Sequence, residues 1–116
     1  MYKVLFYRRN NDSVPTVEFK RSFPDNVIGK IDKWIERLQE HGPNLRRPIV
    51  DKIADKIYEL RLSFGHLSPR FLFFYYGKYI IITHGFLKKT REIPRSEIER
   101  ATEYMHDFLR QQGDIS

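Results

Sequence analysis

The fold is decided by residues 57–83, which read IYELRLSFGHLSPRFLFFYYGKYIIIT. From Ile57 apolar and polar side chains alternate with a period of two, which is the pattern of a strand with Leu60 and Leu62 on one face. Two further strands follow, with a Gly-X pair between them that suits a two-residue type II′ hairpin. They are Arg70–Tyr76 and Tyr79–Thr83, joined by Gly77-Lys78. We therefore predict three consecutive strands that form an antiparallel meander.

The segments on either side of this meander contain one predicted strand and three predicted helices. Tyr2–Tyr7 is aromatic and β-branched, which favours a strand. A short helix is predicted over about 14–22, after Ser13 as a plausible N-cap. The strongest helical signal ends near Gly42 and has apolar residues three and four positions apart, namely Ile28, Ile31, Trp34, Ile35 and Leu38. A last helix should begin around Pro94, whereas residues 44–56 are ambiguous because Pro48 interrupts them.

This order of elements predicts an α+β fold, because helices and strands fall into separate runs. We expect a small antiparallel sheet made of the N-terminal strand and the three-strand meander. Two N-terminal helices pack against it, and a C-terminal helix completes the fold. Residues 1–116 are expected to form one domain.

The composition excludes several classes of protein. The chain has no cysteine, which rules out disulfide scaffolds, thiolate zinc sites and thiol nucleophiles. Its longest apolar run, at 71–76, is far shorter than the roughly 18 residues that span a bilayer. The N-terminus lacks the pattern of a signal peptide, so we expect a cytoplasmic protein with no membrane partner.

Positive charge is concentrated in the middle of the chain. The formal net charge is +6, and residues 52–91 alone hold eight basic and two acidic side chains. Such a field attracts polyanions, of which the nucleic-acid backbone is the commonest. A merely solubilising surface explains the charge equally well. If the partner is RNA, we expect Lys52, Lys56 and Arg91 to contribute to binding it.

Two arginines of the meander are candidates for a phosphate site. Arg61 ends one predicted strand and Arg70 opens the next, so a hairpin can make them neighbours. Guanidinium groups bind phosphoryl oxygens through paired hydrogen bonds. His84 follows directly at the end of the predicted third strand, and Lys88 and Lys89 come within reach after it. Such a cluster suits metal-independent cleavage of RNA by its own 2′-hydroxyl, which needs a proton acceptor and positive charge at the phosphorus.

Each candidate residue also has a purely structural interpretation. Arg61 can simply pair with Glu59 on the same strand face. Arg70 can act as a gatekeeper in front of a very apolar strand. A single His84 at a strand end is more often structural than catalytic, and dibasic pairs such as Lys88-Lys89 are usually solvated. The histidines and carboxylates show no metal-ligand spacing, so no metal or cofactor is expected.

Four blocks of the sequence together resemble the phage-derived HigB-like branch of the RelE/ParE toxin superfamily. They are YELR at 58–61, RFLFFY at 70–75, IIITHGFLKKT at 80–90 and PRSEIERA at 94–101. The resemblance implies a RelE-like fold. It also implies the toxin of a type II toxin–antitoxin pair, an endoribonuclease that cleaves mRNA, typically on the translating ribosome.

By this resemblance Arg61 and Arg70 correspond to the cleft arginines, and Lys88 and Lys89 to a terminal basic pair. His84 lies in the same motif. Cleavage would leave 2′,3′-cyclic phosphate and 5′-hydroxyl ends. The expected partners are mRNA, the ribosome and a helix-turn-helix antitoxin, with operator DNA bound only through that antitoxin.

Two other functions are compatible with the same sequence. The superfamily includes ParE-like toxins that poison DNA gyrase without cutting RNA. A basic module that binds RNA or protein but has no catalytic activity is the other alternative.

Overall fold

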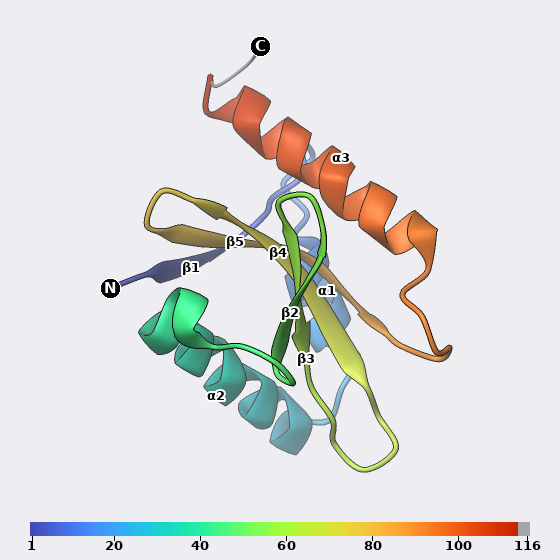
Figure 1. Ribbon diagram of the computed structural model, residues 1–116. Coiled ribbons are helices and arrows are strands. Elements are labelled where there is room, and N and C mark those ends of the chain that lie inside the picture. The colour runs from blue at the N-terminus through green and yellow to red at the C-terminus, as the bar shows by residue number, and fades with distance from the viewer. Residues whose placement is uncertain (114–116) are drawn as a thin grey trace.

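The computed structural model describes residues 1–113 as a central sheet with helices on both faces (Figure 1). The elements in chain order are β1 (Lys3–Phe6), α1 (Pro15–Lys20), α2 (Asp25–His41), the 3-10 turn η1 (Gly42–Asn44), β2 (Val50–Ala54), β3 (Ile57–Arg61), β4 (Pro69–Tyr76), β5 (Tyr79–Leu87) and α3 (Arg95–Gln111). The predicted α+β fold is confirmed. None of the helices within residues 1–113 is both long enough and apolar enough to cross a membrane.

The sheet has five strands in the order β1-β5-β4-β3-β2. Strands β2 to β5 form the predicted type of antiparallel meander, but β1 pairs with β5 in parallel, with Val4 opposite Ile80. The sheet is therefore mixed, and our expectation of a purely antiparallel sheet was wrong. Helices α1 and α2 connect the two edge strands of the sheet, β1 and β2. Strand β1 forms the edge beside β5.

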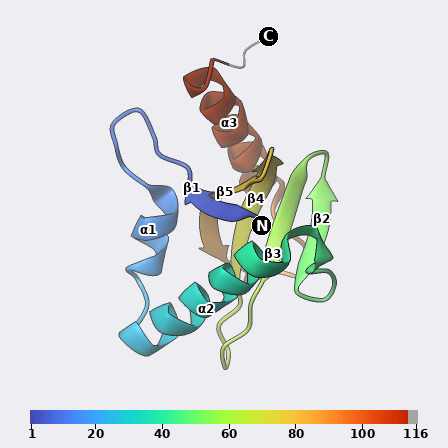
Figure 2. The same cartoon turned by 90° about the vertical axis from the view of Figure 1, so that its left-hand side faces the viewer.

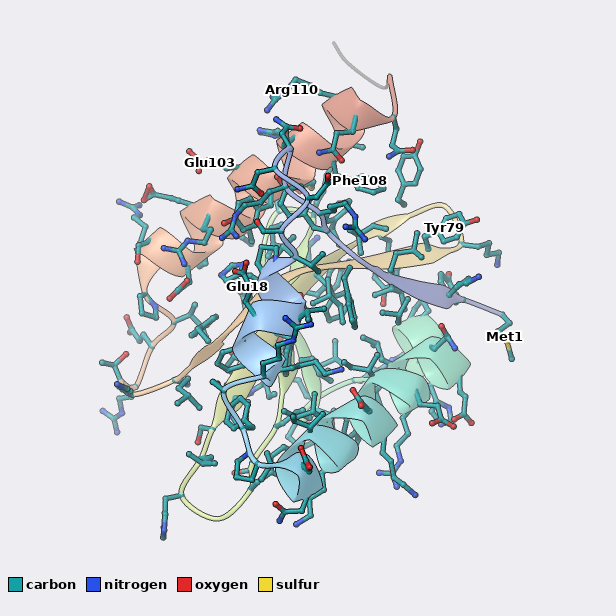
Figure 3. The ribbon with its side chains drawn as sticks, turned by 180° about the vertical axis from the view of Figure 1, so that it is seen from behind. Met1, Glu18, Tyr79, Glu103, Phe108 and Arg110 are labelled. Carbon is teal, nitrogen blue, oxygen red and sulfur yellow. The ribbon has the colours of Figure 1, made fainter. Side chains whose placement is uncertain are left out.

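Two apolar layers hold the helices on opposite faces of the sheet. Helix α2 buries Ile31 and Leu38 against one face, where Phe19 of α1 also packs. Helix α3 buries Ala101 and Phe108 against the other face. Figure 2 shows α2 below the sheet and α3 above it. In Figure 3 Phe108 lies on the sheet side of α3 and Glu103 on the outer side. We call the face of the sheet that α2 covers the α2 face, and the face that α3 covers the α3 face.

The hairpin between β4 and β5 has the predicted two-residue turn. Tyr76 pairs with Tyr79, and Gly77 has a φ of 58°. A positive φ at the first turn position alone is the signature of type II′, and glycine adopts it without strain.

Strand β2 was not predicted, because its sequence lacks a clean alternation. It begins two residues after Pro48 and contains a register shift between Lys52 and Ala54. It pairs with β3 in a hairpin whose connection is only Asp55-Lys56, from Ala54 opposite Ile57 to Val50 opposite Leu60.

Strand β5 continues four residues beyond the predicted end at Thr83, because β4 still has Pro69–Leu72 to pair with it. Leu72 pairs with His84 but Phe73 pairs with Ile82, so Thr83 is the extra residue of a β-bulge. Its hydroxyl donates a hydrogen bond of 3.1 Å to the Leu72 carbonyl. The bulge reverses the alternation of side chains, which places His84 on the α3 face inside the strand and not at its end.

We predict opposite effects of alanine at two glycines. A Cβ at Gly85 would overlap the Phe19 ring and lie 2.8 Å from Phe71, whereas a Cβ at Gly29 in α2 meets nothing within 4 Å. Gly85→Ala should destabilise the protein by about 1–3 kcal/mol, because a packed core must shift. Gly29→Ala should stabilise it by up to about 1 kcal/mol through helix propensity. Urea unfolding measures both, and equal effects would contradict the packing around Gly85.

Candidate functional site

Arg61 and Arg70 are direct partners across the β3–β4 hairpin. Both lie on the α3 face, because each is two residues from a member of the cross-strand pair Glu59 and Leu72, and Leu72 packs in the α3 layer. The predicted neighbourhood of the two arginines is therefore confirmed. Their side chains emerge beside each other at the end of the hairpin that leads into the turn 62–68.

Glu59 holds the two guanidinium groups. Its Oε2 lies 3.1 Å from Arg70 Nε, and its Oε1 lies 3.7 Å from Arg61 Nε. The Glu59 side chain is only 4% exposed, so both contacts form in a largely dry environment. The contact with Arg70 is an ion pair without the alignment of a hydrogen bond. The structural alternative, that Arg61 pairs with Glu59, is thus observed, and Arg70 shares the same carboxylate.

Burial raises the pKa of the Glu59 carboxyl. Three positive charges oppose that rise, in the order Arg70, Arg61 and Lys88. Lys88 follows β5, and its backbone N–H donates to the Ser68 carbonyl at 3.0 Å, which places it beside the start of β4. We call Glu59, Arg61, Arg70 and Lys88 the Glu59 cluster. Asp51, which lies opposite Glu59 on β2, adds to the rise, but it is paired with Arg47. The three cations of the cluster therefore still leave a net positive charge on the α3 face.

The two arginines of the cluster differ in accessibility. The Arg70 side chain is 10% exposed, and its Nη1 donates to the Leu62 carbonyl at 2.8 Å and the Pro69 carbonyl at 3.3 Å. Burial lowers the pKa of Arg70, although Glu59 opposes this shift. The Arg61 side chain is 35% exposed and has Glu59 as its only ion-pair partner among residues 1–113. Arg61 can therefore reach a ligand, whereas Arg70 mainly fixes the turn and the carboxylate.

His84 lies on the same face but in a separate site. Leu72 pairs with Glu59 on one side and with His84 on the other, so the Cα atoms of Glu59 and His84 are two strand spacings apart, about 10 Å. The His84 ring is buried and both nitrogens are engaged, Nε2 with Glu97 Oε1 at 3.0 Å and Nδ1 with Thr83 Oγ1 at 3.1 Å. Burial lowers the pKa of His84, and Glu97 partly opposes this. These contacts tie β5 to the first turn of α3.

The other predicted basic residues are exposed and lie in three different places. Lys89 and Arg91 follow Lys88 in the segment between β5 and α3. Lys52 lies in β2 opposite Tyr58, which puts it on the α2 face and away from the Glu59 cluster. Lys56 lies in the β2–β3 hairpin with a φ of 65°. Within residues 1–113 no group of three or more potential ligands can hold a metal ion.

Comparison with known proteins identifies the relatives of this chain. Residues 18–106 match the model of the family described as phage-derived Gp49-like proteins. The chain belongs to the Gp49-like family. This is a toxin-like family of the RelE/HigB type, so the coarser part of the sequence resemblance is confirmed. The matched segment contains every candidate site residue named above. Among curated proteins, no significant match was found.

The sequence did not predict the central place of Glu59 in this cluster. From the sequence, Glu59 is expected only as a possible surface partner of Arg61. One signal was available: Glu59 is the single acidic residue of β3, and β3 was predicted to pair with the strand that begins at Arg70. Its burial depends on the pairing of β3 with both β2 and β4, and β2 was not foreseen.

Proposed function

We propose that this Gp49-like protein is the toxin of a type II toxin–antitoxin pair and cleaves mRNA on the translating ribosome. The observation that carries the proposal is the Glu59 cluster, in which Arg61 and Arg70 share one buried carboxylate and Lys88 lies close by. Guanidinium and ammonium groups on one face are suited to a backbone phosphate. The toxin-like character of the family supports the same conclusion.

In the proposed reaction the 2′-hydroxyl oxygen of RNA attacks the adjacent phosphorus, and the bond from phosphorus to the 5′-oxygen breaks. Arg61 binds the nonbridging oxygens and stabilises the charge that develops on them. Arg70 holds Glu59 and the turn that positions Arg61. Lys88 or Lys89 accepts the 2′-hydroxyl proton, or it stabilises the leaving 5′-oxygen while water accepts that proton. In both cases the leaving 5′-oxygen takes up a proton from solvent. The products carry a 2′,3′-cyclic phosphate and a 5′-hydroxyl, and the chemistry requires no metal.

The remaining predicted residues have supporting roles in this proposal. His84 orients the start of α3 against β5 through Glu97 and does not touch RNA. Lys52, Lys56 and Arg91 attract the RNA backbone. Alignment of the attacking hydroxyl by the ribosome can contribute several kcal/mol to the rate. A helix-turn-helix antitoxin neutralises the toxin in the cytoplasm and carries the complex to operator DNA.

Induced expression in a bacterial host separates this proposal from gyrase poisoning. We expect growth arrest, new transcript 5′ ends inside coding regions by primer extension, and intact chromosomal DNA. Broken DNA with intact transcripts would contradict the proposal and favour a ParE-like toxin. RNA binding that yields no fragments and no growth arrest would favour a noncatalytic binding module.

A further inference from the structure

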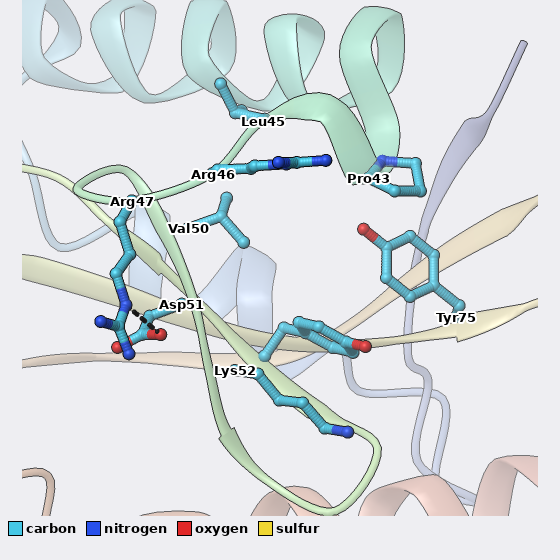
Figure 4. A pocket seen from close by; sticks show the side chains of 9 residues that line it. Pro43, Leu45, Arg46, Arg47, Val50, Asp51, Lys52 and Tyr75 are labelled. Atoms are coloured by element: carbon cyan, nitrogen blue, oxygen red, sulfur yellow. Dashed lines mark hydrogen bonds and ion pairs between the residues drawn. The ribbon is translucent and has the colours of Figure 1, made fainter.

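A cavity of about 280 Å³ lies on the α2 face, on the opposite side of the sheet from the Glu59 cluster. Two half-buried tyrosines and several basic side chains line it. Figure 4 shows the Arg46 side chain extended over the cavity toward Pro43, with the Tyr75 hydroxyl pointing into it. Tyr58 forms the floor beside Lys52, its cross-strand partner.

Two of the cations around this cavity have no charged partner in the described part of the chain. Arg47 is neutralised by Asp51, with its Nε 2.9 Å from Oδ1. Arg46 and Lys52 make no side-chain hydrogen bond or ion pair within residues 1–113. Unpaired cations at the rim of a concave site favour an anionic ligand. Burial raises the pKa of Tyr75 to about 12, so its hydroxyl stays neutral and does not repel an anion.

The tyrosine rings form a rigid aromatic wall. Tyr58 and Tyr75 meet edge to face with centroids 5.1 Å apart, and Phe73 stacks on Tyr58 at 5.6 Å. The same two tyrosines also line a second cavity of about 340 Å³, which includes Lys56. Two adjoining hollows thus share one aromatic wall, with Lys52 in the first and Lys56 in the second. Aromatic rings combined with cations are the elements that bind unpaired bases and their phosphates.

We propose that this aromatic–basic cavity binds a nucleotide of single-stranded RNA, with the base against Tyr75 and Tyr58 and the phosphate on Arg46 and Lys52. The choice of RNA as ligand rests on the proposed function. Tyr58 and Arg61 are three residues apart in β3, about 10 Å along the strand and on opposite faces. An RNA strand that passes over the edge strand β2 contacts both the cavity and the Glu59 cluster. The cavity then acts as an anchoring subsite that does not take part in the chemistry.

Binding of an uncleavable, fluorescently labelled 2′-O-methyl hexanucleotide tests the proposal without any need for cleavage. We expect Arg46→Ala/Lys52→Ala to weaken binding about tenfold or more and to lower the slope of log affinity against log salt by about 0.7, which corresponds to the one phosphate that the two cations neutralise. The matched control is Arg21→Ala/Lys33→Ala, which also removes two exposed cations. We expect this control to lose far less affinity. Equal losses in the two double variants would overturn the proposal.

Photocrosslinking of 4-thiouridine RNA locates the base independently of affinity. We expect crosslinks in the tryptic peptides 57–61 and 71–78, which contain Tyr58 and Tyr75. We expect them to persist in Arg61→Ala, where loss of the trypsin site at 61 turns the first peptide into 57–70. Crosslinks confined to other peptides would overturn the subsite. The subsite stands if these crosslinks form even though induction causes no RNA cleavage, in which case only the proposed function fails. If the Arg46/Lys52 variant binds RNA normally but escapes neutralisation by the antitoxin, the cavity belongs to an acidic protein segment and the proposal is wrong.

Discussion

Arg61→Ala is expected to abolish growth inhibition while the protein remains folded. Arg61 is the more accessible of the two arginines in the Glu59 cluster. The distance between its Nε and Glu59 Oε1 is long, at 3.7 Å. Loss of one group that stabilises transition-state charge typically lowers a rate by about 10²–10³. The measurement is the rate of appearance of new RNA 5′ ends after induction, compared at equal protein level.

Arg21→Ala is the matched control, because it removes one exposed positive charge at the end of α1, far from the cluster in sequence and fold. This variant should cleave as fast as the parent. A folded Arg61→Ala protein that cleaves at the parental rate would show that Arg61 does not bind the scissile phosphate.

Glu59→Ala is expected to cause the largest loss of stability of any substitution in the site. It leaves the buried Arg70 guanidinium without its only carboxylate partner among residues 1–113, and breaking one side of a buried ion pair typically costs about 3–5 kcal/mol. Arg70→Ala should cost a similar amount, because it leaves the Glu59 carboxylate with Arg61 alone and removes the hydrogen bond to Leu62. Urea unfolding monitored through Trp34 fluorescence measures both changes.

The double variant Glu59→Leu/Arg70→Met separates stability from activity. Apolar residues of similar volume remove both charges, so this protein should be more stable than either single variant. It should still be impaired in RNA cleavage, because Arg61 has lost the carboxylate that positions it. A double variant that is as unstable as Glu59→Ala would contradict the description of the pair as mutually compensating.

The parts of the fold that local pattern determines were predicted well. The alternation from Ile57, the turn at Gly77-Lys78 and the apolar stripe of α2 each depend on residues close in sequence, and each has its predicted form. The parallel pairing of β1 with β5 joins residues more than 70 positions apart, and no local signal specifies its direction. Strand β2 was missed for a different reason: it pairs with its neighbour β3, but an irregularity between Lys52 and Ala54 interrupts the alternation that would mark it as a strand.

The candidate site was predicted only where hairpin geometry fixes it. Arg61 and Arg70 are cross-strand partners because a hairpin joins their strands, and the sequence reveals that hairpin. The position of His84 depends on the bulge at Thr83, which reverses the direction of every later side chain in β5. Residue type also does not reveal burial. Arg70 and His84 are both buried, so they bind other parts of the protein and are not free to contact a ligand.

The chemistry of RNA ends in cells that express the parent or Arg61→Ala tests the central claim most directly. Selective ligation to 5′-hydroxyl ends, followed by sequencing, should reveal abundant new ends inside coding regions with the parent, each matched by an upstream fragment that ends in a 2′,3′-cyclic phosphate. These ends should be absent with Arg61→Ala at the same protein level. Growth arrest by the parent without new 5′-hydroxyl ends, or the same ends with both proteins, would contradict RNA cleavage at the Glu59 cluster.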